Sequence, residues 1–441
     1  MTPDITLPPR ASPGMRLAHV VYQIILHLLL PVALAMVVWR SRREPLYRAF
    51  LHHRFGFGPV GARGAVWVFA ASLGETRAVS PLISELLLAG CHVCLTHSSP
   101  AGLAEGRRLF RDDRITHRYV PLDLFWCVWL FLVRLRPTCG LVVESEIWPG
   151  QLLLARRLGI PMVQVNGNLL NRTIERDIKR FFGLRLALFQ QFAAILTKTT
   201  RYRDRYLRIG VAPDRIACPG ELKFDQPVPA PQVEAGLALR KLWAGNLPVF
   251  LIASSVADEE PDLLRLVARL APGARIVWAP RSPQRFDAVA AQLSAAGHTV
   301  ARRSQVLADD LSGTTGATAL VGDSLGEMAF YYALADLVFV GASLVAHGGH
   351  NIVEPLSQGR PVVMGPSIFG ITFPAEDAIA AGALRLAPDA EALGDLVDDL
   401  LGDPAALAAF SEQAQGFAAR YTGAARRSRQ CLAPLLDRAA P

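Results

Sequence analysis

The feature of this sequence that most constrains its fold is a repeated alternation between short apolar runs and longer amphipathic stretches. The first apolar run is AVWVFAA at 65–71, and it precedes ETRAVSPLISELLLAG at 75–90, which ends in glycine. A short run rich in Val and Phe predicts a buried strand, and the amphipathic stretch after it predicts a helix. Repeated βαβ units of this kind predict a parallel sheet with helices on both faces.

The alternation continues along the rest of the chain and predicts strands at regular intervals. In the first half we expect further strands at 92–98, 139–145, 161–167 and 192–199. In the second half we expect strands at 248–255, 274–280, 298–303, 317–323, 337–343 and 361–366. A last helical stretch is expected from about Pro404 to Ala439.

The alternation is interrupted once, at FDQPVPAPQVEAGLA (224–238), which contains three prolines and is interpreted as an inter-domain linker. A chain of 441 residues is long enough for two domains. We therefore expect an α/β protein with two tandem doubly wound, Rossmann-like domains at 46–225 and 226–441, the second including the C-terminal helix. Ligands of such sheets bind at the carboxyl ends of the strands, here in a cleft between the domains.

An apolar segment precedes the first domain, within residues 1–45. Residues 17–39 contain no Asp, Glu, Lys or Arg over 23 residues, which is long enough to cross a hydrocarbon core of about 30 Å. Five arginines lie between residues 40 and 54, against two before the segment. This bias predicts a single anchor in the inner membrane with the domains in the cytoplasm. The alternative is a helix that lies in the membrane interface or packs on the first domain.

Composition excludes several classes of partner and cofactor. The formal net charge is +8, but no basic run is interleaved with aromatic residues, so we expect anionic lipid rather than nucleic acid as a partner. The pair Cys91–Cys94 has no second cysteine pair, which argues against a zinc site. The chain also has no Asp-x-Asp pair, which argues against the usual metal-bridged sugar-nucleotide site.

Polar residues follow the predicted strands of the first half, where this architecture places sites. Glu75 follows one strand and opens a helix. An acidic residue is favoured near a helix start on structural grounds alone, but at a strand end it could also accept a proton. Glu144 and Glu146 end another strand and are expected to face opposite sides of it. Lys223 lies just before the linker, where the ordinary alternative is a solvated lysine.

The second half carries three polar turns. Arg281 follows a predicted strand, between two prolines, and Gly326 and Glu327 precede an apolar-faced helix. The glycines of GGHN at 348–351 permit close approach of the backbone to a ligand, and Glu354 begins the next helix. Backbone amides at such turns suit a phosphate, and a carboxylate suits the hydroxyls of a ribose. This half is therefore predicted to bind a nucleotide.

Taken in order, SLGET, ESEIWP, ELKFD, APRSPQRF, GDSLGEM and VGASLVAHGGHNIVEPLSQGRPVVMGP resemble the motifs of the bacterial Kdo transferases. These enzymes transfer 3-deoxy-D-manno-octulosonic acid (Kdo) from CMP-Kdo to the lipid A precursor in lipopolysaccharide assembly. The resemblance covers nearly the whole chain, including the apolar segment. It implies the two-domain GT-B glycosyltransferase fold, a CMP-Kdo donor, an anionic glycolipid acceptor, and no metal or other cofactor.

The resemblance also implies roles for individual residues. Glu75 is implied as the general base, and Glu144 and Lys223 as groups that stabilise the transition state. The implied contacts to CMP are Pro280, Arg281, Leu325, Gly326, Glu327, Asn351, Ile352, Val353 and Glu354. The implied reaction is a displacement with inversion, in which Glu75 takes the proton of the acceptor hydroxyl.

Five positions depart from the pattern of the family. Phe69 and Ser282 stand where the family has His, Asn168 replaces an arginine, Leu170 a serine and Glu221 an asparagine. Most of these positions lie in the first half, which is expected to bind the acceptor. Three alternatives remain open at this point: a GT-B transferase that uses another nucleotide sugar, a paralogue with another acceptor, and a non-catalytic, membrane-bound lipid-binding paralogue.

Overall fold

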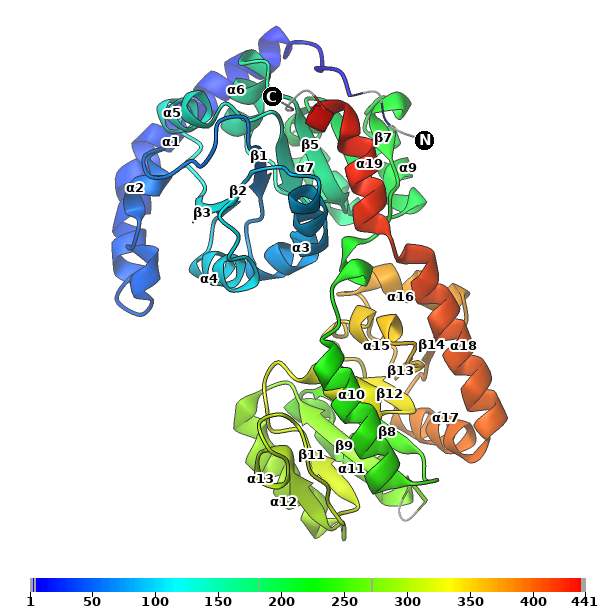
Figure 1. Cartoon of the computed structure of the whole chain (residues 1–441). Coiled ribbons are helices and arrows are strands. Elements are labelled where there is room, and N and C mark those ends of the chain that lie inside the picture. Colours follow the sequence, from blue (N-terminus) through cyan, green and yellow to red (C-terminus); the bar gives the residue numbers. More distant parts are fainter. Residues whose placement is uncertain (1–2, 4, 182, 271–272, 438–441) are drawn as a thin grey trace. The chain divides into compact units, whose positions relative to one another are not determined.

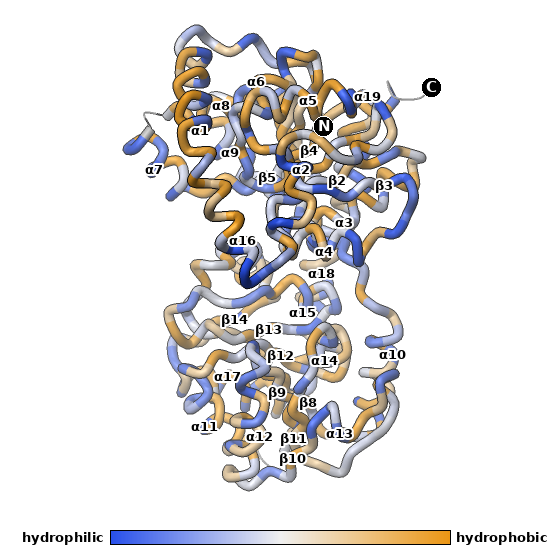
Figure 2. Tube along the Cα trace, turned by 90° about the vertical axis from the view of Figure 1, so that its left-hand side faces the viewer, coloured by the Kyte–Doolittle hydropathy of each residue, from blue (hydrophilic) through white to orange (hydrophobic). Residues whose placement is uncertain are grey.

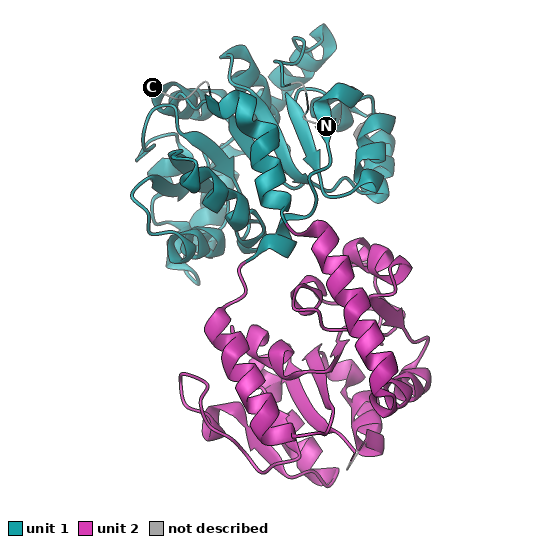
Figure 3. Cartoon of the chain, turned by 45° about the vertical axis from the view of Figure 1, so that its right-hand side comes forward, with its two compact units in different colours: residues 1–226, 423–441 teal, residues 227–422 magenta. Residues whose placement is uncertain are grey.

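The computed structural model describes residues 3, 5–181, 183–270 and 273–437. The chain forms two compact units, one of residues 1–226 with 423–441 and the other of residues 227–422 (Figure 3). The boundary falls inside the proline-containing stretch at 224–238. Most of that stretch is not an extended linker, because residues Ala230–Leu239 form helix α10.

Unit 1 is built on a parallel sheet of seven strands in the order β3-β2-β1-β4-β5-β6-β7 (Figure 1). The strands are β1 (Val66–Phe69), β2 (Val93–His97), β3 (Ile115–Tyr119), β4 (Gly140–Val143), β5 (Met162–Gly167), β6 (Ala194–Thr197) and β7 (Ile216–Ala217). The sequence did not predict β3 or β7. The first reads ITHRY, with three polar residues, and the second has only two residues, so neither produces an apolar run.

Helices cover both faces of the sheet of unit 1. They are α1 (Pro13–Arg40), α2 (Leu51–Arg54), α3 (Leu73–Leu88), α4 (Pro100–Leu109), α5 (Phe125–Leu135), α6 (Pro149–Arg157), α7 (Asn171–Phe181), α8 (Leu184–Phe189), α9 (Thr200–Arg208) and α19 (Ala424–Leu436), with short 3₁₀ turns at η1 (Pro45–Tyr47), η2 (Pro213–Arg215) and η3 (Leu222–Asp225). One apolar cluster joins the strands to α3 and α19, and the other joins them to α5, α6 and α8. Both faces of the strands are therefore buried, which explains their continuous apolar runs.

Unit 2 repeats this architecture with the strand order β10-β11-β9-β8-β12-β13-β14. Its strands are β8 (Val249–Ser255), β9 (Arg275–Pro280), β10 (Val300–Arg302), β11 (Ala319–Val321), β12 (Leu337–Val340), β13 (Val362–Met364) and β14 (Leu384–Leu386). Its helices are α10, α11 (Glu260–Leu270), α12 (Phe286–Ala295), α13 (Arg303–Val306), α14 (Met328–Leu334), α15 (Val353–Ser357), α16 (Thr372–Ala380), α17 (Ala390–Gly402) and α18 (Pro404–Tyr421), with short turns at η4 (Arg240–Ala244), η5 (Ala257–Glu259) and η6 (Pro283–Arg285). All pairs are parallel, as the alternation predicts.

The C-terminal helical stretch is divided between the units, which differs from its assignment to the second domain. Helix α18 belongs to unit 2, and α19 packs on α3 of unit 1. Gly423, with φ of 87°, separates the two helices. The carboxylate of Asp225 accepts hydrogen bonds from the amides of Gly423 and Ala425, each at 2.6 Å, and so caps the start of α19. The last two residues of the predicted stretch, 438–439, lie outside the described residues.

Helix α1 is long and apolar, and it also carries a polar stripe. It spans 28 residues, its most apolar window has a mean hydropathy of 2.3, and it is long and apolar enough to cross a membrane (Figure 2). The hydroxyl of Tyr22 donates to the carboxylate of Asp123 at 3.0 Å. The amide of Gln23 donates to the carbonyl of Asp123 at 2.8 Å and accepts from the amide of Phe125 at 2.9 Å. The segment therefore docks on unit 1, as one of the alternatives from the sequence had it.

Candidate functional site

The predicted catalytic residues of unit 1 lie where its strand order changes direction. The chain runs from β1 outward through β2 and β3, and then from β4 outward in the other direction, so β1 and β4 are neighbours. Ligands of open α/β sheets bind outside the carboxyl ends of the strands at such a switch point. Glu75 follows β1 and Glu144 follows β4, and these two carboxylates therefore flank it.

Glu75 is half-buried and lies in the first turn of α3, whose N-cap is Ser72. Its carboxylate accepts from the amide of Ala71 at 2.7 Å and from the hydroxyl of Ser72 at 3.2 Å. Its own amide donates to Ser72 at 3.3 Å. Burial raises the pKa of Glu75 to about 7, with further contributions from Glu144 and Glu146, while the hydrogen bonds oppose the shift. The residue thus stabilises the start of α3 and is also a carboxyl group whose pKa burial raises to about 7.

Glu144 does not continue the strand, and the expected alternation with Glu146 is wrong for that reason. Strand β4 ends at Val143, and Glu144 has a left-handed backbone with φ of 57°. A left-handed residue breaks the two-residue period of a strand. Both carboxylates raise the pKa of Glu75, so both lie within electrostatic range of it. Glu146 also accepts a hydrogen bond from the indole of Trp148 at 2.7 Å.

The structure adds a buried lysine to this site that the sequence analysis did not single out. The ammonium group of Lys198 lies 3.0 Å from the carboxylate of Glu144 and 3.0 Å from that of Glu221. The Lys198 side chain is 7% exposed, and that of Glu221 is 3% exposed. Burial opposes the charge on Lys198, but the two carboxylates outweigh it and raise the pKa of the lysine. The only feature of the sequence that could have pointed to Lys198 is that it is one of few lysines and lies at the end of a predicted strand.

Lys223 completes the charges around Glu144. It lies in η3, and its ammonium group is 3.9 Å from the carboxylate of Glu144. Burial works against ionisation of Glu144, but Lys198 and Lys223 outweigh it and lower the pKa of the carboxyl group. The site thus places Glu144, whose pKa its two lysines lower, near Glu75, whose pKa is raised to about 7. Three of these four residues were predicted from the sequence.

The predicted nucleotide contacts of unit 2 also follow neighbouring strands. Pro280 ends β9 and Arg281 is the next residue, while 325–327 follow β11 and 351–354 follow β12. Strands β11, β9, β8 and β12 are adjacent, and the order of this sheet changes direction between β8 and β12. The side chain of Arg281 is exposed. Partial burial lowers the pKa of the half-buried His350, and the charge of Arg281 lowers it further. Arg281 and the GGHN turn therefore lie at the same edge of the sheet.

The turn at 325–327 is held from inside by its own carboxylate. Glu327 accepts from the guanidinium of Arg303 at 2.7 Å and from the hydroxyl of Ser324. Gly326 has φ of 83°, which disfavours any other residue, and the space where a Cβ would stand is open. Leu325 is 74% exposed. The turn thus presents an exposed side chain and bare backbone beside the end of β11.

The residues at 351–354 divide into two that face outward and two that face the core. Asn351 and Glu354 are exposed, and the amide of Asn351 donates to the carboxylate of Glu354 at 3.2 Å. Ile352 and Val353 are 0% and 3% exposed. Their predicted contact to a nucleotide could therefore involve only the backbone, since burial of an apolar side chain in the core keeps it from a ligand.

A buried carboxylate that the sequence analysis missed shapes the switch point of unit 2. Glu259 is 0% exposed and accepts from the amides of Ala342 and Val256, at 2.7 and 3.0 Å. Burial raises the pKa of Glu259, and the amide hydrogen bonds oppose the shift. This carboxylate ties the turn after β8 to the turn after β12. Glu259 lies in the acidic stretch ADEEPD, and nothing in that stretch distinguishes it from a solvent-exposed acidic residue.

Comparison with known proteins agrees with this arrangement. The family profile described as 3-Deoxy-D-manno-octulosonic-acid transferase (kdotransferase) matches residues 50–226. The 3-deoxy-D-manno-octulosonic acid transferase of Bordetella pertussis is 38% identical over 418 residues, which covers 90% of this chain and 94% of that protein. This chain belongs to the Kdo transferase family. The Haemophilus influenzae protein of the same name is 29% identical over 423 residues, covering 92% of this chain and 96% of that protein.

As a Kdo transferase, the chain is a glycosyltransferase, and its fold is GT-B. A solved glycosyltransferase from Rickettsia africae matches with a TM-score of 0.55, over 85% of this chain and 99% of that chain. The sequence identity is 11%, so this likeness concerns the fold alone. The expected family and fold class are both confirmed.

Three of the positions at which this Kdo transferase departs from the expected pattern have clear structural surroundings in unit 1. Phe69 is fully buried in β1. Asn168 donates to Glu144 at 3.2 Å, and Glu221 pairs with the buried Lys198. With an asparagine at position 221, Glu144 would be the only carboxylate of this pair left to neutralise the charge of Lys198. Nothing in the structure explains the serine at 282 or the leucine at 170.

Proposed function

We propose that this Kdo transferase takes the sugar from CMP-Kdo and transfers it to a lipid A precursor, with inversion and with Glu75 as the general base. The observation that carries the proposal is the half-buried carboxyl group of Glu75, held by Ala71 and Ser72 after β1. Burial and the nearby Glu144 and Glu146 raise its pKa to about 7. A base whose pKa lies near the working pH combines a useful ionised fraction with proton affinity. Glu75 takes the proton of the acceptor hydroxyl while that oxygen attacks the anomeric carbon.

The cluster of Glu144, Lys198 and Lys223 supports charge stabilisation in this step. Lys223 is the more accessible of the two lysines, with 34% of its side chain exposed, and it is the one that we assign to substrate. Lys198 is enclosed by two carboxylates and acts on Glu144, which it holds ionised and in place. Preorganised charges of this kind stabilise developing charge without reorganisation.

The donor is assigned to unit 2, whose turns follow adjacent strands as in other nucleotide-binding sheets. Arg281 is assigned to the charge of the phosphate, because its guanidinium is exposed at the sheet edge. Asn351 and Glu354, which also face outward, are assigned to the phosphate side and the ribose. CMP leaves as a phosphate monoester anion, and cationic groups stabilise that charge.

The deciding assay incubates the protein with CMP-Kdo and a panel of lipid acceptors, and mass spectrometry detects the products. Transfer from a UDP-sugar but not from CMP-Kdo would refute the assignment of CMP-Kdo as the donor.

Removing the charge of Arg281 should weaken the binding of CMP. We expect Arg281→Ala to cost about 1.5–3 kcal/mol of binding free energy, the usual contribution of a hydrogen bond to a charged group. Isothermal titration calorimetry with CMP measures the change. Arg420→Ala removes an exposed arginine from α18 of the same unit and should leave the affinity unchanged. Wild-type CMP affinity in both Arg281→Ala and Glu354→Ala would contradict the assignment.

The lipid acceptor is expected at the inner membrane, and α1 is the proposed attachment. Deleting residues 1–40 should move most of the protein from the membrane fraction to the supernatant, since this removes the apolar surface of the helix. Residual binding through basic surface residues should fall as salt rises, because salt screens exposed charges. Sedimentation of membranes with immunodetection measures the distribution. Full-length protein that is soluble without detergent would contradict the proposal.

A further inference from the structure

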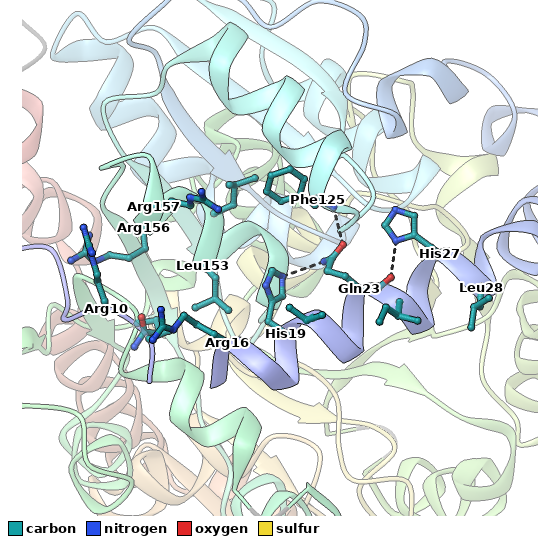
Figure 4. A pocket seen from close by; sticks show the side chains of 15 residues that line it. Arg10, Arg16, His19, Gln23, His27, Leu28, Phe125, Leu153, Arg156 and Arg157 are labelled. Atoms are coloured by element: carbon teal, nitrogen blue, oxygen red, sulfur yellow. Dashed lines mark hydrogen bonds between the residues drawn. The ribbon is translucent and has the colours of Figure 1, made fainter. Parts of the chain in front are cut away.

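The face of α1 that docks on unit 1 leaves a groove along its length. The groove has a volume of about 1130 Å³ and lies between α1, the start of α5 and α6 (Figure 4). It is larger than the roughly 300–1,000 Å³ of most small-molecule sites. It lies wholly within unit 1 and is lined by none of Glu75, Glu144 or Lys223.

One end of the groove is strongly basic. Four arginines line it: Arg10, Arg16, Arg156 and Arg157. Figure 4 shows them gathered at one end, with His27 and Leu28 at the other. No acidic residue is among the described residues that line the groove. Within the described part of the chain, the only hydrogen bond of these guanidinium groups is the one that Arg156 donates to the carbonyl of Pro8. Arginine clusters of this kind bind phosphate, because the planar guanidinium donates two parallel hydrogen bonds.

The rest of the groove is apolar. Val20, Ile24 and Leu28 recur along one side of α1, and Leu153 and Phe125 line the groove as well. Val20, Ile24 and Leu28 are between 54% and 74% exposed, so unit 1 leaves much of their surface uncovered. From Arg16 to Leu28 a helix rises about 18 Å. One leaflet of a hydrocarbon core is about 15 Å thick, so the apolar part of the groove has the length of an acyl chain.

We propose that this groove, which we call the α1 groove, binds one anionic phospholipid of the membrane, with its phosphate at the four arginines and an acyl chain along α1. The basic end and the apolar trough match the two ends of such a lipid. The hydrogen bonds of Tyr22 and Gln23 to residues 123 and 125 keep this part of α1 against unit 1. The lipid thus fills the space between the helix and the unit, and the site is separate from the proposed transfer chemistry.

The test measures lipid retained by the full-length protein in a non-ionic detergent, by native mass spectrometry. The probes are a phosphatidylglycerol and a phosphatidylcholine with identical acyl chains. We expect one phosphatidylglycerol per chain, bound at least about tenfold more tightly than phosphatidylcholine, since charged hydrogen bonds supply at least that factor. Equal retention of the two lipids would overturn the proposal. Complete displacement by inorganic phosphate would also overturn it and indicate a site for free phosphate.

Two variants and a matched control locate the lipid. Arg16→Gln with Arg157→Gln should weaken phosphatidylglycerol binding at least about tenfold, and Ile24→Trp should weaken it by filling the trough without changing charge. Arg42→Gln with Arg43→Gln removes the same charge from exposed residues beyond α1 and should leave binding unchanged. Equal retention by the groove variants and the control would overturn the proposal. Because no sugar transfer is measured, this result is independent of the proposed reaction.

Discussion

Glu75→Gln should lower the turnover of Kdo transfer by at least about 100-fold, because glutamine has the size and polarity of glutamate but cannot take the acceptor proton. If Glu75 were only an acidic residue at the start of α3, the substitution would cost about 1 kcal/mol of stability at most and leave turnover nearly intact. Single-turnover kinetics with CMP-Kdo and a lipid A precursor measure the difference. The affinity for CMP should stay near wild type, since the proposed CMP contacts lie in unit 2.

The pH dependence gives a second readout for the same residue. The pKa of Glu75 is raised to about 7, and only the ionised carboxylate accepts a proton, so kcat/KM should rise with pH through about 7. This rise should disappear in Glu75→Gln. Glu85→Gln is the matched control, because it lies on the same helix and pairs with Arg429 away from the site. A folded Glu75→Gln variant with near-wild-type turnover would exclude Glu75 as the general base and make Glu144 the next candidate.

Lys198→Met should destabilise the protein by about 3–5 kcal/mol at neutral pH, because it leaves the buried carboxylate of Glu221 without its counter-charge and leaves Glu144 with Lys223 alone. Urea unfolding measures the loss. Adding Glu221→Gln should recover part of the lost stability, since the unpaired buried charge of Glu221 is then removed. Lys179→Met changes an exposed lysine on α7 and should have little effect. Equal stabilities of Lys198→Met and Lys179→Met would contradict the role of the ion pair.

The loss in Lys198→Met should also depend on pH in a defined direction. In the wild type the pKa of Glu144 is lowered by its lysines, so this residue contributes stability above the unfolded pKa of about 4.3. In the variant, only Lys223 is left to oppose burial, so the pKa of Glu144 is higher than in the wild type and less stability is lost as pH falls. The difference between wild type and variant should therefore shrink from pH 8 to pH 5.5. A constant difference would indicate a packing defect rather than lost charge.

Local patterns in the sequence predicted most elements of the fold. Strands buried on both faces must be apolar throughout, so their apolar runs mark their positions. Ten of the eleven expected strands agree with an observed strand to within two residues at both ends. The remaining one, at 337–343, begins with β12 at Leu337 and extends three residues past the end of β12 at Val340. The strands that were missed lack this signal: β3 carries Thr116, His117 and Arg118, and β7 and β14 have two and three residues. Sites follow strand ends in this architecture, which is why Glu75, Glu144 and Arg281 could be singled out without a structure.

The sequence by itself thus determined the fold class, the family and the polar residues at the strand ends, because each of these depends on patterns among residues that are close together in the sequence. Only the tertiary structure decided which distant groups meet. Lys198 reaches Glu144 across 54 positions, Gln23 reaches the carbonyl of Asp123 across 100, and Asp225 caps α19 across 198. Such contacts are set by how helices pack on the sheet, and no local period records them. The same packing turns Ile352 and Val353 into the core and leaves a basic groove beside α1.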